Sequence, residues 1–163
     1  MRLVSASGQE GWPLPGGTLE FLHGNWQAYR TLTDFLLGRP GSFDGQAAFA
    51  AAPAEAGLPA GALAYQETGE LRFGGHRGPA SRSLLFLPEA DGAAEVLFAD
   101  RRPFYRLDLR SGRWQAEHPC REDQYLVSVL VLGPDRFTEH WRVRGPGKDY
   151  EMTTTLTRIG IAA

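Results

Sequence analysis

His118 and Cys120 are the two residues whose types and spacing come closest to a catalytic pair. In an extended chain, residues two apart point to the same side, so the imidazole and the thiol could approach each other. A neighbouring imidazolium lowers the pKa of a thiol and makes it a nucleophile. A cysteine enzyme also needs an oxyanion hole and an orienting group, and the sequence identifies neither. We therefore interpret His118 as a strand-end residue, followed by Pro119, and Cys120 as a small buried thiol.

Several charged residues fall on the side of the predicted strands that carries the large apolar side chains. They are Arg30, Glu67, Arg82, His118, Glu139 and Arg158. An unpaired buried polar group costs about 1–3 kcal/mol and a charged one more, against a total stability of about 5–15 kcal/mol. These residues must pair, contact water or face a cavity, and we expect a polar-lined internal pocket. The alternative places them at the strand ends, in water, with the alternation displaced at a bulge.

Metal and cofactor chemistry has a weaker basis in the sequence. Of the four histidines, an inward-facing His118 could serve as the proximal ligand of a haem. A hemin titration without a Soret band would remove this alternative. No second histidine or cysteine stands at zinc-ligand spacing. We expect no metal site and no cofactor, with haem as the less favoured possibility.

The elements that must position these residues alternate with a period of two. Between Tyr150 and Arg158 every second residue is mostly large or apolar and the residues between are polar, and Phe137 to Arg144 alternates in the same way. Such sorting is typical of strands rather than helices. The predicted turns are Thr68-Gly69, Asp91-Gly92, Ser111-Gly112 and Gly145 to Asp149.

About ten short strands with tight turns leave no room for crossover helices, so the chain is all-β and antiparallel. An open sheet of ten strands would curl or split, and we predict a closed barrel, with a two-sheet sandwich as the alternative. A short N-terminal helix is expected, with Thr18 as its N-cap and Leu19, Phe21 and Leu22 as its apolar residues. We expect residues 1–17 to form a flexible arm and residues 18–163 a single barrel domain.

Composition excludes several classes of function. The chain has 163 residues, with 17 basic and 19 acidic side chains and a net charge of −2. This balance argues against a nucleic-acid binder, and no apolar run is long enough to suggest a membrane partner. The single cysteine allows no internal disulfide, which favours a cytoplasmic location.

One predicted strand has an unusual pattern. The stretch from Tyr125 to Leu132 is apolar on both faces apart from Ser128. Such a strand is either covered on both sides or lies in an interface. A homodimer, and with it a structural or interaction role, is therefore an alternative that sedimentation would test.

The sequence resembles lipocalin and calycin barrels at its first predicted strand. Gly24-Asn25-Trp26 is similar to their Gly-x-Trp signature. The resemblance implies that Trp26 closes the barrel floor and that an arginine from a late strand packs across it. Arg158 is the matching arginine, and such a cation–π contact is worth roughly 0.5–2 kcal/mol.

The stretch from Phe21 to Ile159 more specifically resembles the family called domain of unknown function 6314. The matching residues are Gly24, Trp26, Arg30, Phe43-x-Gly45-x-Ala47-x-Phe49, Tyr65-x-Glu67-x-Gly69, Phe98-x-Asp100-x-Arg102-x-Phe104, His118-x-Cys120-x-x-Asp123-x-Tyr125, Trp141 and Gly145-Pro146-x-Lys148-Asp149-Tyr150. From this resemblance we would expect glycine in place of Arg101 and histidine in place of Tyr105. It implies a calycin-like barrel without an assigned activity.

We predict a non-catalytic binder of a small, partly polar or anionic molecule inside a β-barrel. The candidate ligand-binding residues are Tyr65, Glu67, Arg82, Tyr105, His118, Glu139, Trp141 and Lys148. One alternative is an enzyme that uses His118 as general base with Glu67 or Cys120 as its partner. The others are a haem binder of the nitrobindin type and the structural or dimerisation module.

Overall fold

The computed structural model describes residues 13–160, and ten strands account for most of them. The elements are α1 (Thr18–Leu22), β1 (Gly24–Asp34), β2 (Arg39–Ala51), β3 (Leu63–Phe73), β4 (His76–Pro88), β5 (Ala94–Phe98), β6 (Pro103–Leu107), β7 (Arg113–Cys120), β8 (Asp123–Gly133), β9 (Arg136–Gly145) and β10 (Lys148–Arg158), with 3-10 turns at Ala54–Ala56 and Ala90–Gly92. None of the helices in this part of the chain has the length and apolarity to cross a bilayer.

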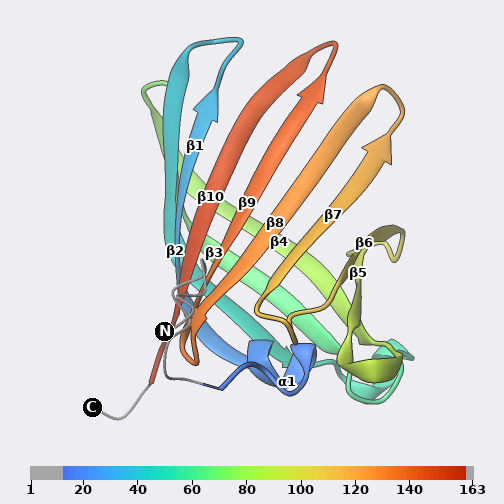
Figure 1. The fold of residues 1–163 in the computed structure, drawn as a ribbon. Helices are drawn as coiled ribbons and strands as arrows, with labels where there is room; N and C mark the ends of the chain where they lie inside the picture. The colour runs from blue at the N-terminus through green and yellow to red at the C-terminus, as the bar shows by residue number, and fades with distance from the viewer. Residues whose placement is uncertain (1–12, 161–163) are drawn as a thin grey trace, which may run out of the picture.

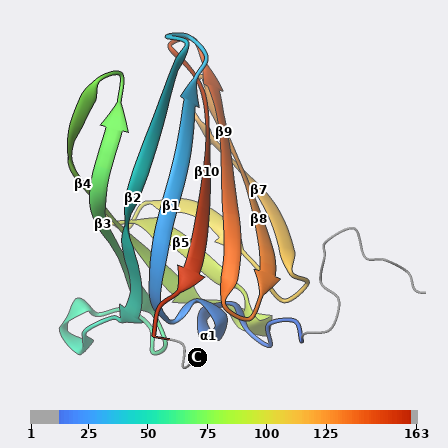
Figure 2. The ribbon, with the colours of Figure 1, turned by 90° about the vertical axis from the view of Figure 1, so that its left-hand side faces the viewer.

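The strands form one antiparallel sheet in the order β6-β5-β4-β3-β2-β1-β10-β9-β8-β7. The sheet curls on itself, so that β7 to β10 face β3 to β5 across the interior (Figure 1, Figure 2). This is a nearly closed barrel, which confirms the predicted all-β barrel of ten antiparallel strands. Within residues 13–160 no strand ladder joins β6 to β7, the two ends of the sheet.

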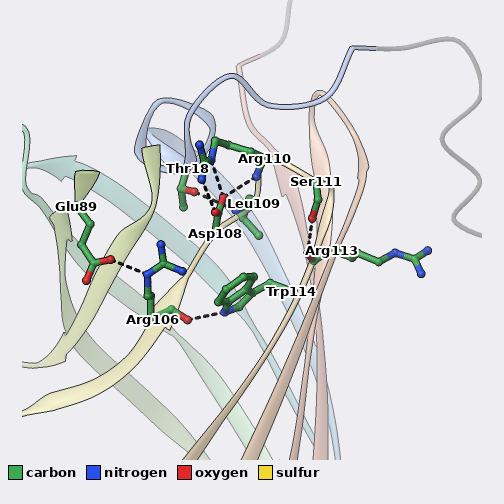
Figure 3. Close-up of polar contacts among 9 residues, drawn as sticks. All are labelled: Thr18, Glu89, Arg106, Asp108, Leu109, Arg110, Ser111, Arg113 and Trp114. Carbon is green, nitrogen blue, oxygen red and sulfur yellow. Dashed lines mark hydrogen bonds and ion pairs between the residues drawn. The ribbon is translucent and has the colours of Figure 1, made fainter. Parts of the chain in front are cut away.

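A seam of side-chain contacts brings β6 and β7 together where the ladder is missing (Figure 3). The indole nitrogen of Trp114 donates a 2.5 Å hydrogen bond to the carbonyl oxygen of Arg106, and the Arg106 guanidinium forms a 2.7 Å ion pair with Glu89. Leu109 donates its backbone N–H to the hydroxyl of Thr18 at 3.0 Å. These contacts hold the lower part of the seam and fasten α1 to the barrel.

Thr18 therefore has a different role from the one we predicted. The N-cap of α1 is Gly17, and Thr18 is the first helical residue and fully buried. Its hydroxyl serves the chain between β6 and β7 rather than its own helix. A threonine before an apolar run commonly caps a helix by accepting a hydrogen bond from a backbone N–H of the first turn. Here the Thr18 hydroxyl accepts the backbone N–H of the distant Leu109 instead.

The lower end of the barrel is closed by aromatic packing and one arginine. Trp26 is fully buried, donates its indole N–H to the Leu22 carbonyl at 2.8 Å and meets the Phe137 ring edge-on at 4.9 Å. The guanidinium of Arg158 lies 4.2 Å from the centre of the Trp26 ring. Gly24 has φ of +131°, and a Cβ there would come within 3.0 Å of an Arg158 nitrogen. Glycine before this tryptophan thus makes room for the arginine.

The predicted Thr68-Gly69 turn is wrong, because β3 runs unbroken through it and turns only at Gly74 and Gly75. Gly69 pairs with Gly45 of β2 across the sheet. A Cβ on Gly69 would lie 2.6 Å from the Cα of Gly45 and 2.8 Å from the ring of Phe43. The two glycines let the Phe43 ring lie flat on the sheet, so here glycine marks close packing rather than a turn.

The β5–β6 hairpin is short and leaves one side of the wall incomplete. Only Leu84–Pro88 of β4 pair with β5, so residues 76–83 have a ladder with β3 alone. On the other side β7 has a ladder with β8 alone. Pro79 and Pro119 lie on these two free edges, where proline is tolerated and discourages further strand pairing. We call this stretch of wall, where no strand ladder joins residues 76–83 to residues 113–120, the side opening.

Candidate functional site

A charged network fills the interior behind the side opening. Glu67 on β3 is at its centre, with 3% of its side chain exposed. Arg30 of β1 donates hydrogen bonds from Nη2 and Nη1 to the two carboxylate oxygens, at 2.9 and 3.2 Å. Its Nε–H donates to the Thr154 hydroxyl at 2.7 Å. The Tyr65 hydroxyl donates to the same carboxylate at 2.9 Å. Arg82 of β4 approaches it with its Nε at 2.9 Å.

The network keeps the Glu67 carboxylate and the Arg82 guanidinium ionised. Burial by itself would raise the pKa of Glu67, but the charges of Arg82 and Arg30 and the hydrogen bonds outweigh it and hold that pKa below its usual value. For Arg82 burial acts in the lowering direction, and the carboxylates of Glu67 and Glu139 reverse it and raise the pKa. Burial, reinforced by Glu67, raises the pKa of Tyr65, so its phenol stays protonated and can donate.

Arg82 differs from Arg30 in what its guanidinium can still bind. The Arg30 side chain is 13% exposed, and all three of its nitrogens donate hydrogen bonds. The Arg82 side chain is 34% exposed and faces Glu67 only through Nε, which lies at ion-pair distance without hydrogen-bond geometry. Its Nη1 and Nη2 donate to no other residue of the described chain. Arg82 is therefore anchored at its stem with its terminal donors available.

Glu139 and Trp141 on β9 face this network from across the barrel. The Trp141 indole N–H donates to the Glu139 carboxylate at 2.6 Å. Burial raises the pKa of Tyr105 well above its usual value, and the Glu139 charge adds to the effect. Between these groups lies a cavity of about 20 Å³, whose lining includes Arg30, Tyr65, Arg82 and Glu139. That volume holds roughly one water molecule, so the expected internal pocket is nearly filled at this depth.

An aromatic stack forms the lower border of the side opening. The Phe98 and Phe104 rings are stacked with centroids 4.2 Å apart, and Phe104 stacks in turn on Trp141 at 5.1 Å. His118 of β7 meets Phe104 edge-on at 5.3 Å. Phe98 and Phe104 are half-buried, whereas Trp141 is buried. We call Phe98, Phe104 and Trp141 the aromatic ledge.

Phe98 and Phe104 are not among the site residues predicted from the sequence. By alternation Phe104 belongs on the opposite face from the buried Tyr105. The register between β5 and β6 shifts between Val96 and Leu97, which is a bulge, and both Phe104 and Tyr105 contact Trp141. The available signals were the alternation of Phe98 with the buried Val96 and the aromatic residues on both sides of the 99–102 turn.

The structure brings most of the predicted ligand-binding residues together and places two at the rim. Tyr65, Glu67, Arg82, Tyr105, Glu139 and Trp141 form the interior group just described. His118 lies across the side opening from Arg82, on β7, and contacts aromatic rings. Lys148 is at the β9–β10 turn, where it donates to the Tyr125 hydroxyl at 2.9 Å and pairs with Asp123 at 3.2 Å.

Cys120 is exposed, so its interpretation as a buried thiol is wrong. The strand ends at this residue, and the tight turn to Asp123 leaves the thiol in solvent. Within the described chain His118 forms no hydrogen bond or ion pair with Cys120 or with Glu67, the two partners that the enzyme alternative assigned to it. Among residues 13–160, no three histidine, cysteine or acidic side chains converge on a common point that could hold a metal.

Comparison with known proteins identifies the family. The model of a family of unknown function, DUF6314, matches residues 22–158. The chain belongs to this family. No curated protein matches the sequence.

Two solved structures show the same architecture at low sequence identity. The S-type phycobiliprotein lyase CPES from Guillardia theta has a TM-score of 0.61 and 10% identity over 88% of this chain and 92% of that one. A protein of unknown function from the DUF3598 family of Nostoc punctiforme has a TM-score of 0.56 and 15% identity. This chain is covered to 90% there, but it spans only half of that protein. These similarities show the barrel fold of the DUF6314 chain.

Proposed function

We propose that this DUF6314 protein binds a small molecule with an anionic group and a flat apolar body at the side opening, without changing it chemically. The observation that carries the proposal is Arg82, which is held in place by Glu67 with its terminal nitrogens free, two residues along β4 from Leu84, the cross-strand partner of Phe98 in the aromatic ledge. Pockets for small molecules commonly combine a few directed polar groups with aromatic walls.

The guanidinium favours a carboxylate, phosphate or sulfonate group. Its two terminal nitrogens form a planar fork that matches two oxygens of such a group. Arg30 already neutralises the buried carboxylate of Glu67 through two hydrogen bonds. Arg82 is thus a second cation at the same carboxylate, and it can turn its outer donors to a ligand without leaving Glu67 unpaired.

The ledge and the packed interior set the shape of the ligand body. The Phe104 ring is stacked between Phe98 and Trp141, so the half-buried ledge offers mainly ring edges, which favour a flat aromatic partner in an edge-to-face arrangement. Below Arg82 the cavity of about 20 Å³ excludes anything larger than water. The ligand body therefore rests on Phe98 and Phe104 near the surface rather than deep in the barrel. The similar barrel from Guillardia theta is a phycobiliprotein lyase, so a barrel of this architecture can carry a function directed at another molecule.

A pair of fluorescent probes tests the role of Arg82. The anionic probe 8-anilinonaphthalene-1-sulfonate and the neutral N-phenyl-1-naphthylamine share their rings and differ by the sulfonate. We expect the native protein to bind the anionic probe more tightly. Arg82→Gln should weaken the anionic probe roughly tenfold, as expected for a lost charge-assisted contact, and leave the neutral probe unchanged.

Two further variants make this test specific. Phe104→Ala should weaken both probes, because both rest on the aromatic ledge. Arg113→Gln removes an exposed arginine from the outer face of β7 and should change neither affinity. The proposal is contradicted if each probe binds Arg82→Gln with the same affinity as it binds the native protein.

A further inference from the structure

The β1–β2 turn carries an unusual concentration of exposed apolar side chains. Phe35, Leu36 and Leu37 are 47%, 58% and 58% exposed, and together they make half of the six large apolar residues exposed in the described chain. Scattered exposed apolar residues are normal, but three in one turn mark an interaction site. We call these three residues the apolar tip. It lies at the end of the barrel opposite α1 (Figure 1, Figure 2).

The apolar tip is held outward by its own backbone contacts. The Asp34 carboxylate accepts the backbone N–H groups of Leu36 and Leu37, each at 3.0 Å. Phe35 donates its N–H to the Asp149 carbonyl of β10 at 2.8 Å. The Arg142 guanidinium lies 4.8 Å from the centre of the Phe35 ring. The two leucines are therefore presented to solvent by an ordered turn.

Basic residues surround the hollow next to this turn. An open hollow of about 420 Å³ lies over the ends of β2, β3 and β4, and Arg72, His76 and Arg77 line it. Arg72 and Arg77 are direct cross-strand partners and share the single carboxylate of Glu70, at 3.0 and 2.9 Å. Two like charges opposite one another are unfavourable unless an anion offsets them. The two guanidinium groups and the one carboxylate have a net charge of +1, which an external anion can neutralise.

Arg39 adds a further cation at the base of the apolar tip, opposite Asp34 in the β1–β2 pairing. It is the first residue of β2, and its guanidinium lies close to Gly74, where a Cβ would come within 2.9 Å. Arg39 forms no ion pair with another residue of the described chain. The apolar tip thus stands beside a basic hollow.

We propose that the apolar tip and the basic hollow together dock the protein on the surface of a bilayer that contains anionic lipids. Leu36 and Leu37 enter the boundary between headgroups and acyl chains, and Arg39, Arg72 and Arg77 contact lipid phosphates. Interfacial binding combines buried apolar area with attraction to anionic lipid in this way. The expectation of no membrane partner rested on the absence of a long apolar run, which such a contact does not need.

Vesicle flotation tests this proposal independently of the ligand site. The native protein should float with vesicles of phosphatidylcholine containing about a quarter phosphatidylglycerol and bind phosphatidylcholine alone more weakly. The double variant Leu36→Ser, Leu37→Ser should bind the anionic vesicles roughly tenfold less tightly or worse. Arg39→Gln should weaken binding to the anionic vesicles roughly fivefold, with little effect on the neutral ones.

Tyr29→Ser is the matched control, because Tyr29 is 51% exposed on β1 and lies outside the apolar tip. It should leave vesicle binding unchanged, and all variants should keep the native melting temperature. The proposal is overturned if the native protein does not float with anionic vesicles, or if Tyr29→Ser weakens binding as much as the double leucine variant. It is also overturned if the leucine variant converts a native dimer to a monomer in sedimentation, because the apolar tip is then a protein interface.

Discussion

Glu67 and Arg82 are in contact, and the proposed ligand site gives Glu67 a role in stability and Arg82 a role in binding. Glu67 is enclosed by Arg30, Tyr65 and Arg82, so its carboxylate has no capacity left for a ligand. Arg82 has lost part of its hydration but keeps its outer donors. A carboxylate that anchors one end of an arginine restricts its side chain before a ligand arrives, which lowers the entropic cost of binding.

We predict that Glu67→Gln destabilises the fold by about 3–5 kcal/mol, because it leaves two arginines facing a neutral amide. Urea denaturation at neutral pH measures the change. Glu70→Gln, on the same strand but with its carboxylate near the surface, is the control and should have a small effect. Similar losses for the two variants would show that the interior network is not what stabilises this part of the barrel.

The native protein and Glu67→Gln also show how the contribution of Glu67 to the free energy of unfolding depends on pH. The pKa of Glu67 is lower in the folded chain than its usual value, so the unfolded chain binds more protons in acid. Its contribution is complete above the unfolded pKa of about 4.3 and is lost as the pH falls through the lower folded pKa. The stability difference between native protein and Glu67→Gln should therefore narrow below about pH 4, and a constant difference would argue against an ionised Glu67.

Arg101 occupies a backbone conformation that suits glycine. Its φ is +72°, within the turn between β5 and β6. This is the position where the family resemblance led us to expect glycine. Arg101→Gly should raise the free energy of unfolding by up to about 1 kcal/mol through relief of strain, partly offset by the greater freedom of the unfolded chain. A lower melting temperature for the variant would show that the contact of Arg101 with the Ala56 carbonyl outweighs the strain.

The backbones of β2 and β3 leave no space for a side chain between Gly45 and Gly69, which are cross-strand partners. Gly69→Ala should destabilise the barrel by about 1–3 kcal/mol, because the new Cβ would meet the backbone of β2, which has no room to move. Gly133→Ala, whose Cβ would meet nothing within 4 Å, is the matched control and should be close to neutral. Thermal unfolding of both variants checks this, and equal melting temperatures would contradict the packing account.

Period-two alternation was enough to predict the strands and the barrel, because side chains on a strand must alternate between core and solvent. The same rule placed Glu67 and Arg82 on the inner face. The turn signal of Thr68-Gly69 was wrong, because the reason for glycine at Gly69 is the Phe43 ring on the neighbouring strand. Alternation missed Phe104, whose orientation depends on a bulge in the β5–β6 pairing. Both failures involve contacts between strands that a single strand's pattern does not contain.

The molecule as a whole divides into a closed lower half and an incomplete upper wall. Aromatic packing and Arg158 close the floor, and the short β5–β6 hairpin interrupts the wall above it. The apolar tip is at the upper end of the barrel as well (Figure 2). A ligand that reaches Arg82 through the side opening need not displace the core, so binding and folding stability can be altered separately.

Native mass spectrometry of the freshly purified protein, run beside Arg82→Gln, tests the central claim most directly. We predict that the native protein carries a small anionic molecule as a bound adduct and that the same adduct is lost or much reduced in the variant. A native spectrum without any bound small molecule, or the same adduct at equal occupancy in both proteins, would contradict a ligand site built on Arg82.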